Sequence, residues 1–232
     1  MRLPLRLTSL AAGAILLLAP SALLAVLVVS RVGWLDRLDR SVTDALHGFA
    51  LDHPAWVDAM TWWSLVFHPN TWRVAAVGLV IWLARRRRWP PAWWVAVTMA
   101  AGGILGGLLK LLVGRDRPDL LDPVARATGY SFPSGHALNN ALGAAVFLIV
   151  LLPYTAGRPR ARFWLWAAAV AIPLVTGLSR VALGVHWTSD VVAGWLLGVA
   201  VALIARRGLP AGRRELSREK VADGDGIGSG NA

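Results

Sequence analysis

Long runs of apolar residues dominate the chain, and short polar segments separate them. The runs cover residues 7–29, 71–84, 91–113, 137–153, 163–183 and 188–205. A helix needs about 20 apolar residues to cross the hydrocarbon core of a bilayer, and most of the runs approach or exceed that length. The pattern therefore predicts an all-α fold, a six-transmembrane helical bundle.

The first apolar run admits two interpretations. It follows Arg2 and Arg6, and small residues occur near residues 19–22, as in a cleaved secretory signal. The apolar residues continue to Val29, however, which is longer than the apolar region of a signal peptide. We therefore predict that residues 1–30 form a retained first transmembrane helix.

The other segments complete the predicted domain organisation. Residues 31–70 mix acidic side chains with several tryptophans, which favour the headgroup level of a membrane, so this stretch is predicted to be an interfacial segment. Within it a short helix over residues 56–67 is expected to end at His68-Pro69-Asn70. Residues 71–207 would form a five-helix core. The polar stretch 208–232, rich in Gly and Asp, is predicted to be a disordered cytoplasmic tail.

The composition supports a membrane protein and excludes several classes of site. The chain is 56% hydrophobic and 16% charged, with a mean hydropathy of +0.54, which argues against a large soluble domain. It has 0 cysteines, so disulfides, thiolate metal sites and a cysteine nucleophile are excluded.

The net charge of +11 is explained by membrane topology rather than by nucleic-acid binding. If the N-terminus is cytoplasmic, 15 of the 24 Lys and Arg residues fall on the inner side, including the run Arg85 to Arg88 in a short loop. Short cytoplasmic loops are enriched in Lys and Arg, so this orientation is favoured. We expect an inner-membrane, multi-pass protein with both ends in the cytoplasm and no nucleic-acid partner.

Some polar residues in or beside the apolar runs are not explained by topology. Lys110 lies near the outer end of the third span, where a lysine is costly unless it meets an anion or water. Arg117 follows at about two helical turns, so the two cations can project to one side. The competing interpretations are a snorkelling lysine and a solvated charged loop.

A second group of polar residues precedes the fourth span. Pro133, Ser134 and Gly135 predict a turn that presents backbone N–H groups and a hydroxyl at a helix start, which suits an anion. His136 follows at the position where it can deliver a proton. A histidine that merely lies at the membrane interface is the alternative.

A third group lies between the fifth and sixth spans. Arg180 precedes His186, and Asp190 follows that histidine at a helical i,i+4 spacing. On a helix this spacing stacks the two side chains, so Asp190 can accept from one imidazole nitrogen while the other faces a substrate. A helix-capping role for Asp190 is compatible with that function.

These three groups all fall at the non-cytoplasmic ends of spans three to six. Three cations, two histidines and an anion-binding turn at one end of a bundle predict a phosphate site. The cations are Lys110, Arg117 and Arg180.

Together the motifs resemble the three-part signature of the type 2 phosphatidic acid phosphatase superfamily. They read Lys110-x6-Arg117-Pro118, Pro133-Ser134-Gly135-His136 and Ser179-Arg180-x5-His186-x3-Asp190. The resemblance extends from about residue 62 to residue 205. This superfamily includes integral-membrane lipid phosphate phosphatases, undecaprenyl-diphosphate phosphatases and, more distantly, vanadium haloperoxidases.

The resemblance implies a role for each matching residue. His186 would be the nucleophile that becomes a phosphohistidine, Asp190 would orient it, and His136 would be the general acid. Lys110, Arg117, Ser134, Gly135 and Arg180 would bind the phosphate. No metal and no cofactor is implied. The alternative is a magnesium site at Asp116, Asp119 and Asp122. It is disfavoured because magnesium sites generally use carboxylates that the fold brings together from distant parts of the chain.

We therefore expect residues 71–207 to be a catalytic core that hydrolyses a lipid phosphate or diphosphate of the polyprenyl diphosphate, phosphatidic acid or phosphatidylglycerol phosphate type. A lipid phosphotransferase with the same site is the main alternative. A non-catalytic lipid-binding protein is a further one, and a vanadium haloperoxidase is disfavoured because those enzymes are soluble.

Overall fold

The computed structural model describes residues 3–208, and this part of the chain contains helices and no β-strand. The elements are α1 (Leu3–Val29), α2 (Gly33–Asp52), α3 (Pro54–Val66), α4 (Pro69–Arg85), α5 (Trp89–Val113), α6 (Gly135–Leu151), η1 (Leu152–Thr155), α7 (Pro159–Ala182), α8 (Thr188–Ala205) and η2 (Arg206–Gly208). The all-α prediction is confirmed. The predicted tail lies outside the described residues except for Gly208, as do Arg2 and the basic residues of the tail.

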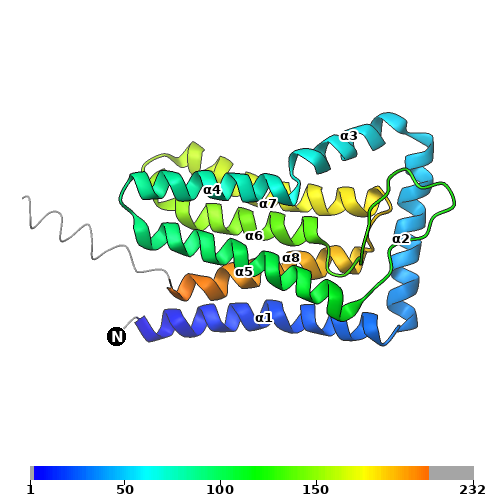
Figure 1. Ribbon diagram of the computed structural model, residues 1–232, viewed down its shortest axis with the longest axis horizontal. Helices are drawn as coiled ribbons and strands as arrows, with labels where there is room; N and C mark the ends of the chain where they lie inside the picture. The colour runs from blue at the N-terminus through cyan, green and yellow to red at the C-terminus, as the bar shows by residue number, and fades with distance from the viewer. Residues whose placement is uncertain (1–2, 209–232) are drawn as a thin grey trace, which may run out of the picture.

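The long helices lie lengthwise beside one another, and α2 closes one end of them. Figure 1 shows α1 and α4 to α8 running in the same or opposite directions, with α2 standing across their ends. The chain turns by 95° between the apolar part of α1 and α2. Helix α8 packs between α1 and α6, and α6 also contacts α4, α5 and α7. Helix α6 is therefore the centre of the bundle.

Among the described residues, 4 helices have the length and apolar composition needed to cross a membrane. They are α5, α6 with η1, α7, and α8 with η2. The bent pair of α1 and α2 raises the number to as many as 5 if it counts as one span. Helix α4 is only 17 residues long. The predicted six-span count therefore stays a prediction.

The helix boundaries follow from local sequence signals. Prolines occupy the first turn of α3, α4, α5 and α7, where a missing N–H costs nothing because the helix has no acceptor for it. The expected break at His68-Pro69-Asn70 is observed, since α3 ends at Val66 and α4 begins at Pro69. Helix α2 was not predicted: residues 33–52 form a regular helix that packs on α7 and α8.

Two glycines of α8 allow its backbone to touch the backbone of α6. A Cβ atom on Gly194 would lie 2.8 Å from the carbonyl oxygen of Ser134, and one on Gly198 would lie 2.5 Å from that of Leu138. No side chain fits at either position without moving the helices apart. This close crossing fixes the start of α6 against the start of α8.

The loops divide between the two ends of the bundle. The α5–α6 and α7–α8 loops lie at the end closed by α2, whereas the α4–α5 loop with its arginine run lies at the opposite end (Figure 1). The residues of the three motifs are therefore brought to one end, and the arginine run is separated from them by the length of the bundle.

Candidate active site

The last turn of α5 carries Lys110, the loop after it carries Arg117, and carbonyl groups of that loop hold both cations. Gly114 ends α5 in the left-handed conformation, with φ of 61°, so the chain turns sharply after Lys110. The ammonium group of Lys110 donates to the carbonyl oxygen of Tyr130. Arg117 donates from Nε to Gly129 O at 2.9 Å and from Nη2 to Thr128 O at 3.0 Å. Both cations are thus fixed by the far side of the same loop.

Arg117 also reaches across to the α7–α8 loop. Its Nη1 donates to the carbonyl oxygen of Val185 at 2.6 Å and lies 3.2 Å from Nε2 of His186. A guanidinium group has donors and no acceptor, so Nε2 must be the acceptor in this contact. The ring proton of His186 is therefore assigned to Nδ1, and the lone pair of Nε2 faces the arginine.

Asp190 lies on the other side of the same imidazole ring. Its Oδ2 is 3.4 Å from Nδ1 of His186 and accepts from the backbone N–H of Trp187 at 2.9 Å. Its Oδ1 accepts from Arg115 at 2.7 Å. The carboxylate thus caps the first turn of α8 and orients the histidine at the same time, which is the combination expected from the sequence.

His186 is buried, and its charge state follows from that burial. Its side chain is 3% exposed. Burial lowers the pKa of His186 to about 4, and the nearby cations Arg117 and Arg180 lower it further, although Asp190 opposes the shift. The imidazole is therefore neutral at pH 7, with the lone pair of Nε2 directed at Arg117.

The predicted turn before α6 is joined directly to this pair. The backbone N–H of Ser134 donates to the carbonyl oxygen of Asp190 at 3.0 Å. The Ser134 hydroxyl caps α6 by accepting from the N–H of Ala137 at 3.4 Å. A Cβ atom on Gly135 would lie 3.8 Å from Cε of Lys110, so the lysine stem passes close to the start of α6. The turn and the first cation therefore meet at this helix N-terminus.

His136 lies against a second histidine that was not predicted to belong to the site. The ring of His68, which precedes α4, meets the ring of His136 edge-on with 5.0 Å between centroids. Burial lowers the pKa of His68, and the charges of Arg180 and Arg73 add to that effect. The charge of Arg180 thus lowers the pKa of both His68 and His186, so Arg180 lies near both side chains.

Arg180 lies in the last turn of α7, and only some of its guanidinium donors have hydrogen-bond partners among the described residues. Its Nη1 donates to the hydroxyl of Ser64 on α3. Its Nε is buried and has no hydrogen-bond acceptor within the part of the chain that the structure describes. A buried guanidinium N–H without a partner is uncommon, and an anion in the site would satisfy it.

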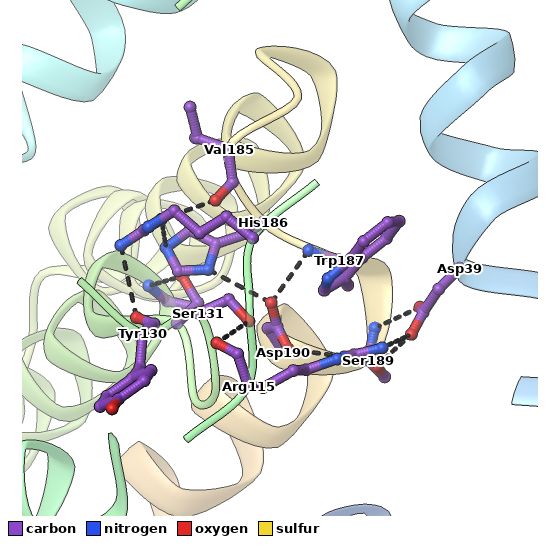
Figure 2. Close-up of polar contacts among 12 residues, drawn as sticks. Asp39, Arg115, Tyr130, Ser131, Val185, His186, Trp187, Ser189 and Asp190 are labelled. Atoms are coloured by element: carbon purple, nitrogen blue, oxygen red, sulfur yellow. Dashed lines mark hydrogen bonds and ion pairs between the residues drawn. The ribbon is translucent and has the colours of Figure 1, made fainter. Parts of the chain in front are cut away.

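Arg115 and Asp39 were missed by the sequence analysis. Figure 2 shows Asp39 reaching from α2 toward Ser189 and Arg115, with Asp190 and His186 beyond them. In the sequence Arg115 looks like one more member of a charged loop. In the structure Asp39 shares the buried face of α2 with Leu35 and Thr43, but the weak apolar periodicity of this helix does not mark that face in the sequence.

The carboxylates considered as magnesium ligands do not converge. Residues 3–208 contain no group of three His, Cys, Asp or Glu side chains placed to hold a metal ion. The backbone carbonyl of Asp116 instead accepts from the Ser131 hydroxyl at 3.0 Å and from the Trp187 indole N–H at 3.0 Å. Asp116 therefore contributes to holding the loop in place.

The geometry agrees with what comparison with known proteins finds. The model of the PAP2 superfamily matches residues 91–214, a range that contains all three motifs. The undecaprenyl-diphosphatase of Sulfolobus acidocaldarius is 35% identical over 109 residues, which are 44% of this chain and 47% of that protein. The chain thus spans about half the length of this relative.

Two further comparisons cover a larger share of this chain. The decaprenylphosphoryl-5-phosphoribose phosphatase of Mycobacterium tuberculosis is 35% identical over 141 residues, which are 59% of this chain and 71% of that protein. The crystal structure of a transmembrane PAP2 type phosphatidylglycerolphosphate phosphatase from Bacillus subtilis superposes with a TM-score of 0.73. It covers 84% of this chain and 94% of that one at 23% identity, so it supports the fold.

Proposed function

The chain belongs to the PAP2 superfamily, and from that membership we propose that it is a membrane-embedded phosphatase that hydrolyses a lipid phosphate or diphosphate through a phosphohistidine. The observation that carries this proposal is the orientation of His186. Its Nε2 lone pair faces the fixed cation Arg117, while Nδ1 faces the buried carboxylate of Asp190. A neutral, oriented imidazole beside a cation is the arrangement that nucleophilic attack on a phosphoryl group requires.

The first step transfers the phosphoryl group to the enzyme. Nε2 of His186 gives up its contact with Arg117 and forms a bond to phosphorus. The bond from phosphorus to the lipid oxygen, or to the bridging oxygen of a diphosphate, breaks at the same time. A protonated His136 gives its proton to the departing oxygen, so that the leaving group does not depart as a bare anion. Asp190 stabilises the positive charge that develops on the imidazole.

The second step returns the enzyme to its starting state. His136, now neutral, takes a proton from a water molecule whose oxygen attacks the phosphorus. The bond from phosphorus to Nε2 of His186 breaks, and inorganic phosphate is released. The two histidines thus have distinct roles, and each is regenerated at the end of the cycle.

Fixed cations neutralise the phosphoryl oxygens during both steps. Phosphoryl transfer depends chiefly on positioning and on stabilisation of the oxygen charges. Lys110, Arg117 and Arg180 supply three positive charges, and the N-terminus of α6 supplies the Ser134 hydroxyl and the backbone N–H of Gly135. The Nε group of Arg180, which has no acceptor within residues 3–208, supports a bound anion here.

We further propose a polyprenyl phosphate or diphosphate as the substrate class. Two of the relatives carry undecaprenyl and decaprenyl in their names, and a cationic site at the end of a lipid-facing bundle suits a phosphate on a long apolar tail. In this account the protein crosses the inner membrane six times, with residues 31–70 at the interface. The site faces the non-cytoplasmic side, because the Arg85 to Arg88 loop lies at the opposite end.

The proposed activity can be tested with the purified full chain in detergent. Release of inorganic phosphate is measured from undecaprenyl diphosphate, decaprenyl phosphate, phosphatidic acid and phosphatidylglycerol phosphate, with His186→Gln as the inactive control. We expect release from the polyprenyl substrates at more than ten times the rate of the control. No release above the control from any of these lipids would contradict the proposal.

A further inference from the structure

A continuous chain of buried charged groups connects α2 to the histidine proposed as the nucleophile. Arg115 donates from Nη2 to Oδ2 of Asp39 at 2.7 Å and from Nη1 to Oδ1 of Asp190 at 2.7 Å. The second oxygen of Asp190 faces Nδ1 of His186. Figure 2 shows these side chains as one row running from α2 to the imidazole ring.

Because these groups are buried, each charge needs its partner to remain stable. The side chains of Asp39 and Asp190 are 0% exposed, and that of Arg115 is 12% exposed. Removing one partner of a buried ion pair leaves an unpaired charge in a medium of low polarity, so the three groups depend on one another. A planar guanidinium that binds two carboxylates has little freedom to turn, and it therefore fixes the plane of the Asp190 carboxylate.

Asp39 is itself held at both oxygens. Its Oδ1 accepts from the backbone N–H of Ser189 at 2.9 Å, and its Oδ2 accepts from the Ser189 hydroxyl at 2.5 Å as well as from Arg115. Ser189 also accepts from Arg115 at 2.7 Å. Asp39 thus accepts hydrogen bonds both from the first turn of α8 and from the guanidinium that binds Asp190.

Trp187 covers the guanidinium from one side. The Arg115 guanidinium carbon lies 5.4 Å from the centroid of its ring, and that of Arg40 lies 5.6 Å from it. Trp187 is 8% exposed, so the ring limits the access of water to Arg115. The charged row is therefore screened little by solvent.

We propose that Asp39 and Arg115 are positioning residues for the phosphatase reaction: the Asp39–Arg115 bridge holds Asp190 so that His186 keeps its proton on Nδ1 and its lone pair on Nε2. This inference rests on the proposed function of His186. Asp39 lies outside residues 91–214, which the superfamily model matches. Helix α2 therefore contributes to catalysis as well as closing the end of the bundle.

The kinetic test uses Asp39→Asn, which keeps the shape of the side chain and an acceptor for Ser189 but removes the charge. Asp44→Asn, an exposed position on the same helix, is the matched control. We expect Asp39→Asn and Arg115→Gln to lower kcat about 10- to 100-fold, as is typical when a partner that orients a histidine through its carboxylate is removed, with KM changed less than about threefold. The control variant should retain the kcat of the wild type.

A double-mutant cycle separates positioning from a purely structural role. If Asp39 acts through Asp190, then Asp39→Asn should cause no further loss of kcat in an Asp190→Asn background, since the group it positions is already changed. Losses that multiply in the double variant would overturn the proposal. Wild-type kcat in both Asp39→Asn and Arg115→Gln would overturn it as well.

A spectroscopic measurement tests the bridge without any activity. Protein labelled with ¹⁵N-histidine is examined by NMR in detergent, and His186→Gln identifies the resonances of His186. The wild type should show the Nδ1–H form, and Arg115→Gln should shift the ¹⁵N and ¹H resonances of the Nδ1–H group, because the Asp190 carboxylate that accepts from it is no longer held by Arg115. An unchanged spectrum in Arg115→Gln would refute the inference, whereas a wild type that releases no phosphate from any lipid would refute the proposed function alone.

Discussion

Replacement of Asp190 by asparagine tests the orientation of the nucleophile through a change of a single group. All three polar neighbours of this carboxylate are donors: the Arg115 guanidinium at 2.7 Å, the backbone N–H of Trp187 at 2.9 Å and Nδ1 of His186 at 3.4 Å. An asparagine amide has one acceptor oxygen and one donor NH₂ group. Whichever way the amide turns, the NH₂ group faces a donor.

Only His186 can relieve that conflict by moving a proton. A guanidinium and a backbone amide cannot become acceptors, but a neutral imidazole can carry its proton on Nε2 and accept at Nδ1. The lone pair then turns toward the NH₂ group of the introduced asparagine, and Nε2 carries an N–H that displaces the Arg117 guanidinium from its contact. A histidine in this form has no lone pair on Nε2, the nitrogen that attacks phosphorus.

The size of the effect follows from comparison with other histidine–carboxylate pairs. Where such a substitution imposes the wrong tautomer, kcat falls by about 10⁴-fold, as known for the aspartate of the serine protease triad. That factor corresponds to about 5 kcal/mol of activation free energy. The protein should still fold, because the amide oxygen can satisfy Trp187 or Arg115.

The assay is single-turnover phosphate release from a polyprenyl diphosphate by Asp190→Asn, with Asp44→Asn as control. Binding of the substrate should change little, because the substituted group does not touch the phosphate. A kcat within tenfold of the wild type, in a variant whose NMR spectrum shows Nε2–H at His186, would refute the reasoning.

Three further predictions address charge, protonation and topology. Activity should persist in excess EDTA, because fixed cations neutralise the phosphoryl oxygens; a need for added divalent cation, measured by restoration of phosphate release, would contradict this. An NMR titration should give a pKa for His186 of about 4. The neutral nucleophile therefore persists as the pH falls from 7 to 5 and is lost as the pH falls through 4. A midpoint near 6.5 would contradict the lowering of this pKa by burial. An impermeant thiol reagent should label Asp122→Cys but not Ala156→Cys in intact cells, and the opposite result would reverse the orientation.

The long apolar helices were predictable because each carries a nearly uncharged run. Helix α8 was predicted with its observed bounds, residues 188–205, and α5 was predicted to begin only two residues late, at residue 91. The contact between His186 and Asp190 was also predicted, although His186 lies in the loop before α8 and the two residues do not share a helix. Apolar runs and short spacings involve residues that are close in the sequence, so they can be identified from the sequence alone.

Helix α2 and its contribution to the site were not predictable in the same way. The buried positions of this helix are Leu35, Asp39, Thr43 and Ala50. Two of these four side chains are polar, so the apolar periodicity that identifies a buried helix face is weak. The partner of Asp39 on α8 is Ser189, 150 residues away, and no sequence spacing reports a contact over that distance.

Two glycines of α8 show how packing determines the site. Gly194 and Gly198 permit the contact between the backbones of α8 and α6 that joins Ser134 to Asp190. In the sequence these glycines resemble those of any transmembrane helix. Only the three-dimensional arrangement identifies them as the reason that the second and third motifs meet.

The most direct test of the central claim is to identify the phosphorylated residue. Purified protein is mixed with ³²P-labelled undecaprenyl diphosphate, quenched within milliseconds in alkali to preserve phosphohistidine, digested and mapped by mass spectrometry. We expect phosphate on His186 in the wild type, its loss in His186→Gln, and its retention in His136→Ala with substrates whose leaving groups need no proton. Phosphate on any other residue, or a phosphoenzyme that persists in His186→Gln, would contradict it.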